Sequence, residues 1–187
     1  MNTSTYMPKG ILFVLLLVVL KTQAQTKYID KNGSLIFEAS EKVFEPVKAK
    51  NESVTMILDV ATNEIAALAL IKGFRFKNSL MEEHFNENYI ESEIYPKATL
   101  KGQLIDFDLS SLTENSSTVM LKGTLKLHGT SKSIEVPVQI TKSNDIMLLV
   151  GSFSVTPQDF NIDIPTIVKN KIAKHIIITF QFKLTKP

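Results

Sequence analysis

The chain has 187 residues, a length that suits one domain with a processed segment and is cramped for two domains. It contains no cysteine, which excludes disulfides, a lipid-modified N-terminal cysteine, and thiolate nucleophiles or metal ligands. Its 21 basic and 19 acidic residues are scattered along the chain, so nothing indicates the basic face that binding of nucleic acid requires.

The first 24 residues are predicted to be a signal peptide. Lys9 precedes an unbroken apolar run at residues 11–20, which is shorter than the ~20 residues of a membrane-spanning helix. Thr22 and Ala24 occupy the small-residue positions that signal peptidase recognises, so cleavage is expected after Ala24. We therefore expect an exported protein, periplasmic or secreted, that comprises residues 25–187 and has no integral membrane span. Without the two lysines of the signal peptide, 19 basic and 19 acidic residues remain, and the chain is formally neutral.

Alternation of apolar and polar residues begins soon after the signal peptide and predicts β-strands. Residues 54–71 form a predicted hairpin with a polar turn at 62–64. Its apolar face comprises Val54, Met56, Leu58, Val60, Ile65, Ala67, Ala69 and Ile71.

A short helix is predicted at about residues 78–86, and it interrupts the strands. Asn78 suits the N-cap position, because its side chain can accept hydrogen bonds from the first helical amides. One helical stripe contains Leu80, Met81, His84 and Phe85. We expect this helix to lie near one end of the strands. A second helical or irregular stretch is predicted at residues 165–175.

Further alternating segments follow, each with one apolar and one polar face. They are residues 99–109, 118–127, 133–140, 147–155 and 175–184. Antiparallel sheets with one buried face have this pattern, and about eight strands at this spacing are typical of a sandwich or barrel. Because closure removes exposed strand edges, we predict an all-β fold, an extended antiparallel barrel of about eight strands in one domain.

Few residues of the chain have the spacing that catalysis or metal binding needs. His128 and Gly129 stand between two predicted strands, where a turn with positive φ explains both of them without any catalytic role. His84 and His175 show no metal-site spacing with His128 or with each other. We therefore expect no metal and no cofactor.

Carboxylates and serines give no stronger indication of catalysis. Glu82 and Glu83 are neighbours on the predicted helix, where successive side chains point about 100° apart and cannot face one substrate atom together. Neither a G-x-S-x-G elbow nor a Gly-rich phosphate loop occurs in the sequence. A protein that is not an enzyme is favoured, and an enzyme that uses His84 and His128 with one of these glutamates is the alternative.

The predicted barrel interior carries the remaining functional information. A barrel of about eight strands either fills its lumen with side chains or leaves room for one small ligand. Small and large residues mix on the predicted inner faces, so an apolar channel and a filled core are equally compatible with the pattern. A channel would favour a hydrocarbon chain by ~0.8 kcal/mol for each buried CH₂ group.

Four blocks of the sequence resemble the YceI-like family of secreted lipid-binding proteins. They span residues 80–104, 123–140, 151–165 and 171–182, in the family's order, and the resemblance extends over essentially all of residues 25–187. The family patterns are YP-x-A-T at 95–99, G-T-L-x-x-H-G-x-x-K at 123–132 and DFNI at 159–162. Residues 41–52 and 106–117 match none of these patterns.

The resemblance implies a lipocalin-like barrel whose lumen holds a long isoprenoid chain, with no catalytic centre and no cofactor. A polyprenyl quinone or polyprenyl phosphate has such a chain. Because residues 25–187 are formally neutral, a quinone or neutral isoprenoid is at least as compatible as an anionic lipid. In this family His128 belongs to the turn signature, which implies a structural role.

We therefore predict binding, transport or storage of a polyisoprenoid or other long-chain lipid in the bacterial envelope. Strand parity predicts a lumen lined by Phe74, Phe76, Met81, Phe85, Leu100, Leu125, Leu127, Phe153, Phe180 and Phe182. A register slip of one residue would turn the set of any strand outward. A structural or stress-related secreted barrel with a filled lumen is the main alternative. The sequence leaves open whether the chain forms a homodimer.

Overall fold

The segments in which apolar and polar residues alternate form nine strands in the computed structural model, which describes residues 26–40 and 46–187. The strands are β1 (Lys27–Ser40), β2 (Lys48–Asp59), β3 (Glu64–Leu70), β4 (Arg75–Phe76), β5 (Lys97–Ile105), β6 (Ser117–Leu127), β7 (Thr130–Ser143), β8 (Ile146–Val155) and β9 (Ile172–Leu184). Short helical segments are η1 (Ile71–Gly73), α2 (Ser79–His84), η2 (Phe85–Tyr89), η3 (Leu109–Ser111) and η4 (Pro157–Phe160). The predicted signal peptide, residues 1–24, lies outside the described residues.

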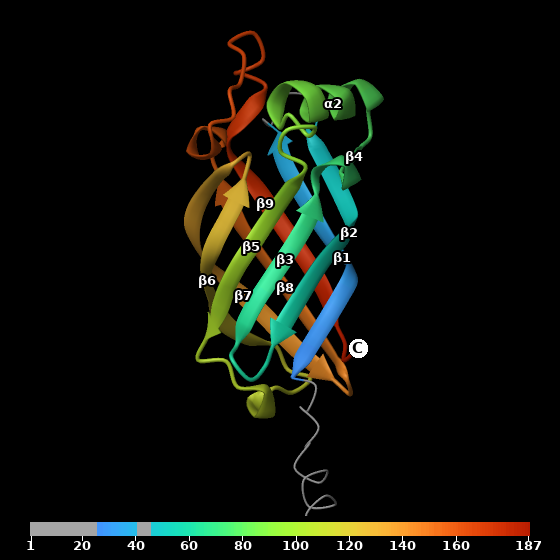
Figure 1. Cartoon of the computed structure of the whole chain (residues 1–187), viewed down its shortest axis with the longest axis vertical. Coiled ribbons are helices and arrows are strands. Elements are labelled where there is room, and N and C mark those ends of the chain that lie inside the picture. Colours follow the sequence, from blue (N-terminus) through green and yellow to red (C-terminus); the bar gives the residue numbers. More distant parts are fainter. Residues whose placement is uncertain (1–25, 41–45) are drawn as a thin grey trace, which may run out of the picture.

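Eight of these strands close into an antiparallel barrel (Figure 1). Hydrogen-bonded neighbours follow the order β1-β9-β8-β7-β6-β5-β3-β2, and β1 pairs with β2 to complete the ring. The two-residue strand β4 extends the sheet at one end of β2, where Phe76 pairs with Ala49. The prediction of an all-β antiparallel barrel of about eight strands is confirmed. None of the helices in the two described ranges is both long enough and apolar enough to cross a membrane.

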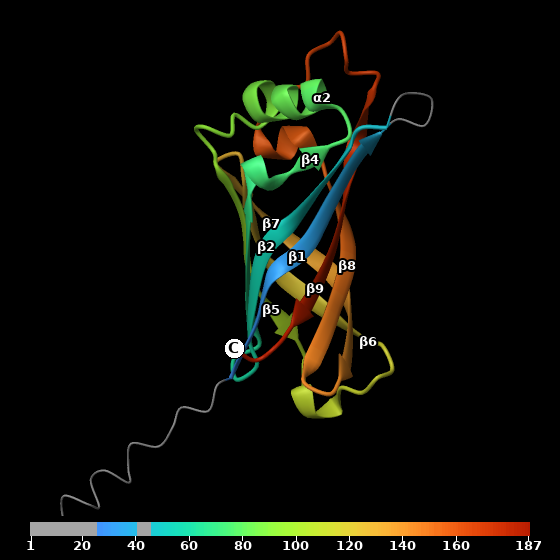
Figure 2. The ribbon, with the colours of Figure 1, turned by 90° about the vertical axis from the view of Figure 1, so that its right-hand side faces the viewer.

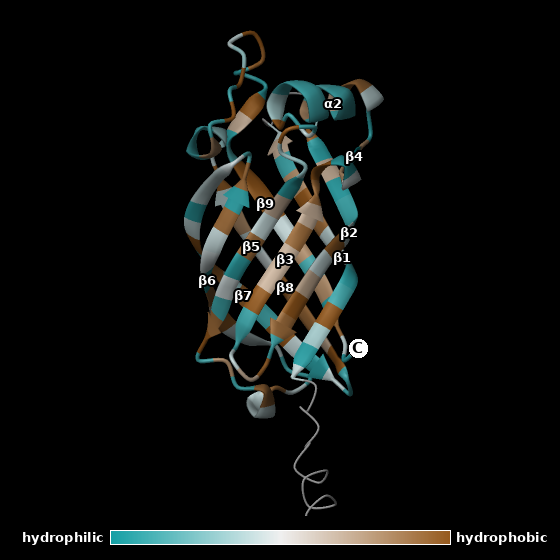
Figure 3. Cartoon of the chain, in the orientation of Figure 1, coloured by the Kyte–Doolittle hydropathy of each residue, from teal (hydrophilic) through white to brown (hydrophobic). Residues whose placement is uncertain are grey.

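The predicted inward faces of the strands are confirmed. On β7, Val136 and Val138 are fully buried, whereas Glu135, Pro137 and Gln139, which alternate with them, are exposed. Figure 3 shows the same alternation as apolar and polar bands that succeed one another along the strands. The side-chain period of two therefore predicted correctly which residues point inside.

The two ends of the barrel differ in the segments that they carry. We call the end with α2, η2 and η4 the helix end, and the end where β9 finishes the opposite end (Figure 2). The opposite end carries the short segment η3 and the β2–β3 and β7–β8 turns. The interior toward the opposite end is tightly packed. Its fully buried side chains include Leu58, Leu121, Ile140, Met147, Leu149 and Leu184.

The predicted helix is present, and it is longer than the sequence indicated. The side chain of Asn78 accepts hydrogen bonds from the amides of Leu80 (2.9 Å) and Met81 (3.4 Å), which confirms the N-cap. The helical path continues through η2 to Tyr89, three residues past the predicted end.

The predicted apolar stripe of this helix is partly wrong. Leu80 is 55% exposed and His84 is also exposed. The side that faces the barrel runs instead through Met81, Phe85 and Tyr89, at positions i, i+4 and i+8. Leu80 lies off this side of the helix, whereas His84 lies at its edge and borders the cavity.

The second stretch that was predicted to be helical or irregular consists of turns. Residues 166–171 make consecutive turns, with the amide of Val168 donating to the carbonyl of Pro165 (3.0 Å) and that of Lys171 to Val168 (2.8 Å). Strand β9 begins at Ile172, so the last four residues of the predicted stretch belong to the barrel wall.

Candidate functional site

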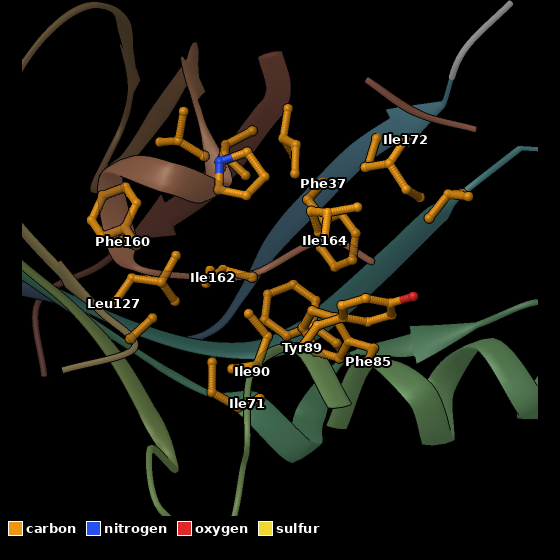
Figure 4. A pocket seen from close by; sticks show the side chains of 18 of the residues that line it. Phe37, Ile71, Phe85, Tyr89, Ile90, Leu127, Phe160, Ile162, Ile164 and Ile172 are labelled. Atoms are coloured by element: carbon orange, nitrogen blue, oxygen red, sulfur yellow. The ribbon is translucent and has the colours of Figure 1, made fainter. Parts of the chain in front are cut away.

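The helix end of the barrel encloses a cavity of about 330 Å³ with an almost wholly apolar lining (Figure 4). Its size is within the range of small-molecule sites, ~300–1,000 Å³. Barrel strands supply the side wall, which includes Leu35, Phe37, Leu125, Leu127, Phe153 and Ile178. Segments at the helix end supply the roof, which includes Met81, Phe85, Tyr89, Phe160, Ile162 and Ile164. The apolar interior of such a cavity favours a hydrocarbon occupant.

Four phenylalanine rings form one side of this cavity. Phe37 on β1 lies 5.5 Å from Phe74, 5.5 Å from Phe76 and 5.1 Å from Phe85, measured between ring centroids. The pairs are tilted, edge-on and stacked, respectively, at separations that aromatic pairs favour. The rings connect the barrel wall to β4 and η2, so the roof is attached to the wall by packing and not by the helix cap alone.

Polar side chains of the lining belong to its rim. His84 and Lys171 line the cavity and are exposed to solvent, and Thr156 is partly exposed. No carboxylate belongs to the lining formed by the described residues. A bound molecule would therefore place its apolar part inside and meet hydrogen-bonding groups only at the mouth.

His128 occupies the turn between β6 and β7, close to the cavity but outside its lining. His128 and Gly129 both have positive φ, 47° and 72°, as a two-residue type I′ hairpin turn requires. A β-carbon on Gly129 would lie 2.8 Å from Cε1 of Tyr95, so the close approach of that ring also requires glycine here.

The imidazole of His128 holds two other segments in place. Its Nδ1 donates a hydrogen bond to the carbonyl oxygen of Phe160 (3.0 Å), and its Nε2 lies 2.9 Å from Oε2 of Glu91. The Tyr95 ring lies 4.4 Å away between centroids, and the imidazole side chain is only 9% exposed. His128 therefore joins the β6–β7 turn to η4 and to the segment after η2, which explains why histidine stands in this turn.

Seven of the ten predicted lumen residues line the cavity. They are Phe74, Phe76, Met81, Phe85, Leu125, Leu127 and Phe153. Leu100, Phe180 and Phe182 face the barrel interior but do not line the cavity. Parity gives the direction in which a side chain points, but not its height along the barrel axis. That any of the ten contacts a ligand stays a prediction.

Several residues of the roof were not expected from the sequence. Phe160, Ile162 and Ile164 line the cavity, and all three come from the segment after β8. Their spacing of two was visible in the DFNIDI run, although that run lies between β8 and β9 and forms no strand. Tyr89 and Ile90 were missed because the helical path runs past residue 86.

The residues considered for catalysis are not brought together. His84 lies at the cavity rim, whereas the imidazole of His128 contacts Glu91 and Phe160. Glu82 pairs with Arg75 at 2.7 Å and accepts a hydrogen bond from the amide of Phe76 at 3.1 Å, which fixes the helix to β4. Among residues 26–40 and 46–187, no group of three metal-ligating side chains could hold a metal ion.

Comparison with protein families matches residues 28–184 to the YceI-like domain. A polyisoprenoid binding domain from Saccharophagus degradans implicated in plant cell wall breakdown has a similar structure, with a TM-score of 0.75 and 16% identity, over 87% of this chain and 99% of that one. BcnA of Burkholderia cenocepacia matches with a TM-score of 0.66 and 14% sequence identity, over 81% of this chain and 96% of that one. The YCEI protein of Campylobacter jejuni matches with a TM-score of 0.57 and 16% sequence identity, over 76% of this chain and 88% of that one. At these identities the likeness shows a shared fold. The comparison with curated proteins gives no match.

Proposed function

Because the chain belongs to the YceI-like domain family, we propose that it binds the apolar chain of a lipid, foremost a polyisoprenoid, and catalyses no reaction. The observation that carries the proposal is the apolar cavity of about 330 Å³ at the helix end. Each methylene group that leaves water for such a site contributes ~0.8 kcal/mol. The similar domain from Saccharophagus degradans is described as polyisoprenoid-binding, which supports the choice of ligand class.

The rim supports an orientation for the lipid. The exposed side chains of His84 and Lys171 and the partly exposed Thr156 lie where a head group would emerge. They offer hydrogen-bond donors and one positive charge, which suits a carbonyl, hydroxyl or anionic head group. We propose that the chain enters the cavity and that the head group stays at the mouth in contact with water.

We propose further that the protein works outside the cytoplasm, in the bacterial envelope. The predicted signal peptide with cleavage after Ala24 supports this location. The test is the intact mass of protein expressed from the full sequence in a bacterial host and recovered from the periplasmic fraction. A mass equal to residues 25–187 is expected there. Uncleaved protein confined to the cytoplasm would contradict the location.

Native mass spectrometry with lipid extraction tests the ligand. Protein purified without detergent from a bacterial host is expected to carry a co-purifying isoprenoid or other long-chain lipid. Leu127→Asp places a carboxylate in the cavity wall and should remove that lipid, because burying an unpaired charge is costly. Lys126→Asp is the matched control, since the neighbouring side chain on the same strand is exposed.

Circular dichroism of both variants separates loss of ligand from loss of the fold. A folded Leu127→Asp protein that keeps its lipid would show that the chain lies elsewhere. Wild-type protein that is folded, carries no lipid and fails to bind added farnesol or quinone would overturn the proposed function.

A further inference from the structure

The cavity ends partway along the barrel, at an aromatic floor. Phe153 on β8 lines the cavity, and its ring centroid lies 6.3 Å from that of Phe180 on β9. Phe182, two residues further along β9, follows at 6.1 Å from Phe180. Phe180 and Phe182 are 5% and 2% exposed and do not line the cavity. The three rings therefore follow one another down the lumen, and the open space ends at the first of them.

Two glycines make room for the lower rings. A β-carbon on Gly151 would lie 2.4 Å from Cζ of Phe180, and one on Gly33 would lie 2.1 Å from Cδ1 of Phe182. Gly151 is the strand partner of Phe180 on β8, so the ring lies directly over the backbone of the neighbouring strand. Leu35 is the strand partner of Phe180 on the other side, on β1. A ring held between two strands in a close-packed interior has no free space to move into.

The volume above this floor limits how much of a chain can be buried. The cavity above the floor measures about 330 Å³, which is at the small end of the range of ligand sites, ~300–1,000 Å³. A chain that enters through the mouth can be buried only as far as the ring of Phe153. Any part of a longer polyprenyl tail would stay outside the cavity.

We propose that Phe180 sets the length of the apolar chain that this protein buries. This inference rests on the proposed function and adds a ligand class to it. The ligands are lipids whose apolar chain fits between the mouth and this floor, with the head group at the rim. Phe180 acts as a specificity-determining residue because it supports the ring of Phe153 at the floor and closes the lumen below it.

A homologous series of linear 1-alkanols from C8 to C16 tests the limit, with dissociation constants measured by competition against a fluorescent fatty-acid probe. For the wild-type protein, each added methylene is expected to tighten binding about fourfold, which corresponds to ~0.8 kcal/mol. The gain should stop within the series, at the chain length that reaches the aromatic floor. In Phe180→Ala the gain should continue for several further carbon atoms. Phe180→Leu should extend the chain-length limit by fewer carbon atoms. It replaces the alanine variant in this test if Phe180→Ala does not fold.

Phe182→Ala is the matched control. It removes the same ring from the same strand and face, but the void lies behind an intact Phe180, so the length limit should stay at the wild-type value. Wild-type affinity that keeps rising to C16, or a limit that does not move in either Phe180 variant, would overturn the inference. An equal shift in Phe182→Ala would also overturn it, because the cause would then be general loosening. Absence of any alkanol binding to folded wild-type protein would instead refute the proposed function.

Discussion

The helix end and the opposite end of the barrel are built from the same strands but have different interiors. Toward the opposite end, Leu121 and Leu149 are fully buried. Toward the helix end, Leu125 and Leu127 on the same face of β6 are only partly buried and border the cavity. The strand pattern is the same in the two halves, and the rings of Phe153 and Phe180 mark where the open space ends.

The roof at the helix end spans the barrel without filling it. Met81 and Phe85 reach in from α2 and η2, and Phe160 reaches in from η4, and all three stop at the cavity boundary. The two alternatives that the sequence left open, a filled core and an apolar channel, therefore both occur. The barrel is filled toward the opposite end and open toward the helix end.

Matched leucine truncations should sharpen this comparison most. Leu149→Ala removes a fully buried side chain from the packed half and should lower the free energy of unfolding by about 3–5 kcal/mol. Leu127→Ala shortens a side chain that already borders empty space and should cost about 1 kcal/mol, because fewer contacts are lost. Urea unfolding followed by circular dichroism measures both. Equal losses would mean that the ligand-free cavity collapses in solution.

The stability of the helix end should depend on a few specific hydrogen bonds, whereas the stability of the opposite end depends on packing. His128→Asn keeps a residue that tolerates positive φ, but it removes the bonds to Phe160 and Glu91. We expect a loss of about 1–3 kcal/mol in unfolding free energy. Lys126→Asn, at an exposed position of the same hairpin, is the control and should change stability by less than ~0.5 kcal/mol.

Hydrogen exchange locates the effect of the His128 change. The amide of Ile162 donates to the carbonyl of Pro157 beside η4, and its exchange should accelerate in His128→Asn. Amides of β8 near Leu149 should keep their protection. If protection fell equally in both places, His128 would support the whole barrel and not the helix end in particular.

Strand parity predicted the fold well because the side-chain period is a local property of the sequence. Val136 and Val138 could be placed inside from their neighbours alone. The height of a side chain along the lumen is not local, since it depends on strand tilt and stagger around the closed barrel. Phe153 and Phe180 satisfy the same parity rule, yet one borders the cavity and the other lies below its floor.

The contacts of His128 could not be predicted from the sequence, because they too are not local. Glu91 and Phe160 lie 37 and 32 residues away along the chain, and only the closed topology brings them to one turn. The turn itself was predictable, because glycine after a short polar residue between two alternating strands indicates a hairpin. Local chemistry therefore identified the turn, whereas its structural role followed only from the fold.

The smallest expected effect is a loss of stability at acid pH, which should arise from two carboxylates at the opposite end. The hydroxyl and the amide of Ser110 donate hydrogen bonds to the carboxylate of Asp108, which lowers the pKa of Asp108 below the usual 3.8. The amide of Ala61 and the hydroxyl of Thr26 donate to the carboxylate of Asp59 and lower the pKa of that residue in the same way. Because these bonds favour the ionised form in the folded state, their stabilisation is present above the unfolded pKa and is lost as the pH falls through the lower folded value.

Thermal unfolding between about pH 5 and pH 3 measures this contribution, since the relevant window begins near the ordinary carboxyl pKa, ~3.9. Asp59→Asn combined with Asp108→Asn should slightly reduce the loss of thermal stability at acid pH, because Asp108 is exposed and Asp59 is partly exposed to solvent. Alkanol affinity of the wild-type protein should stay constant over the same range, as neither residue lines the cavity. A parallel loss of affinity and stability would show that the two ends of the barrel are coupled, and the distinction between a packed end and an independent binding end would no longer hold.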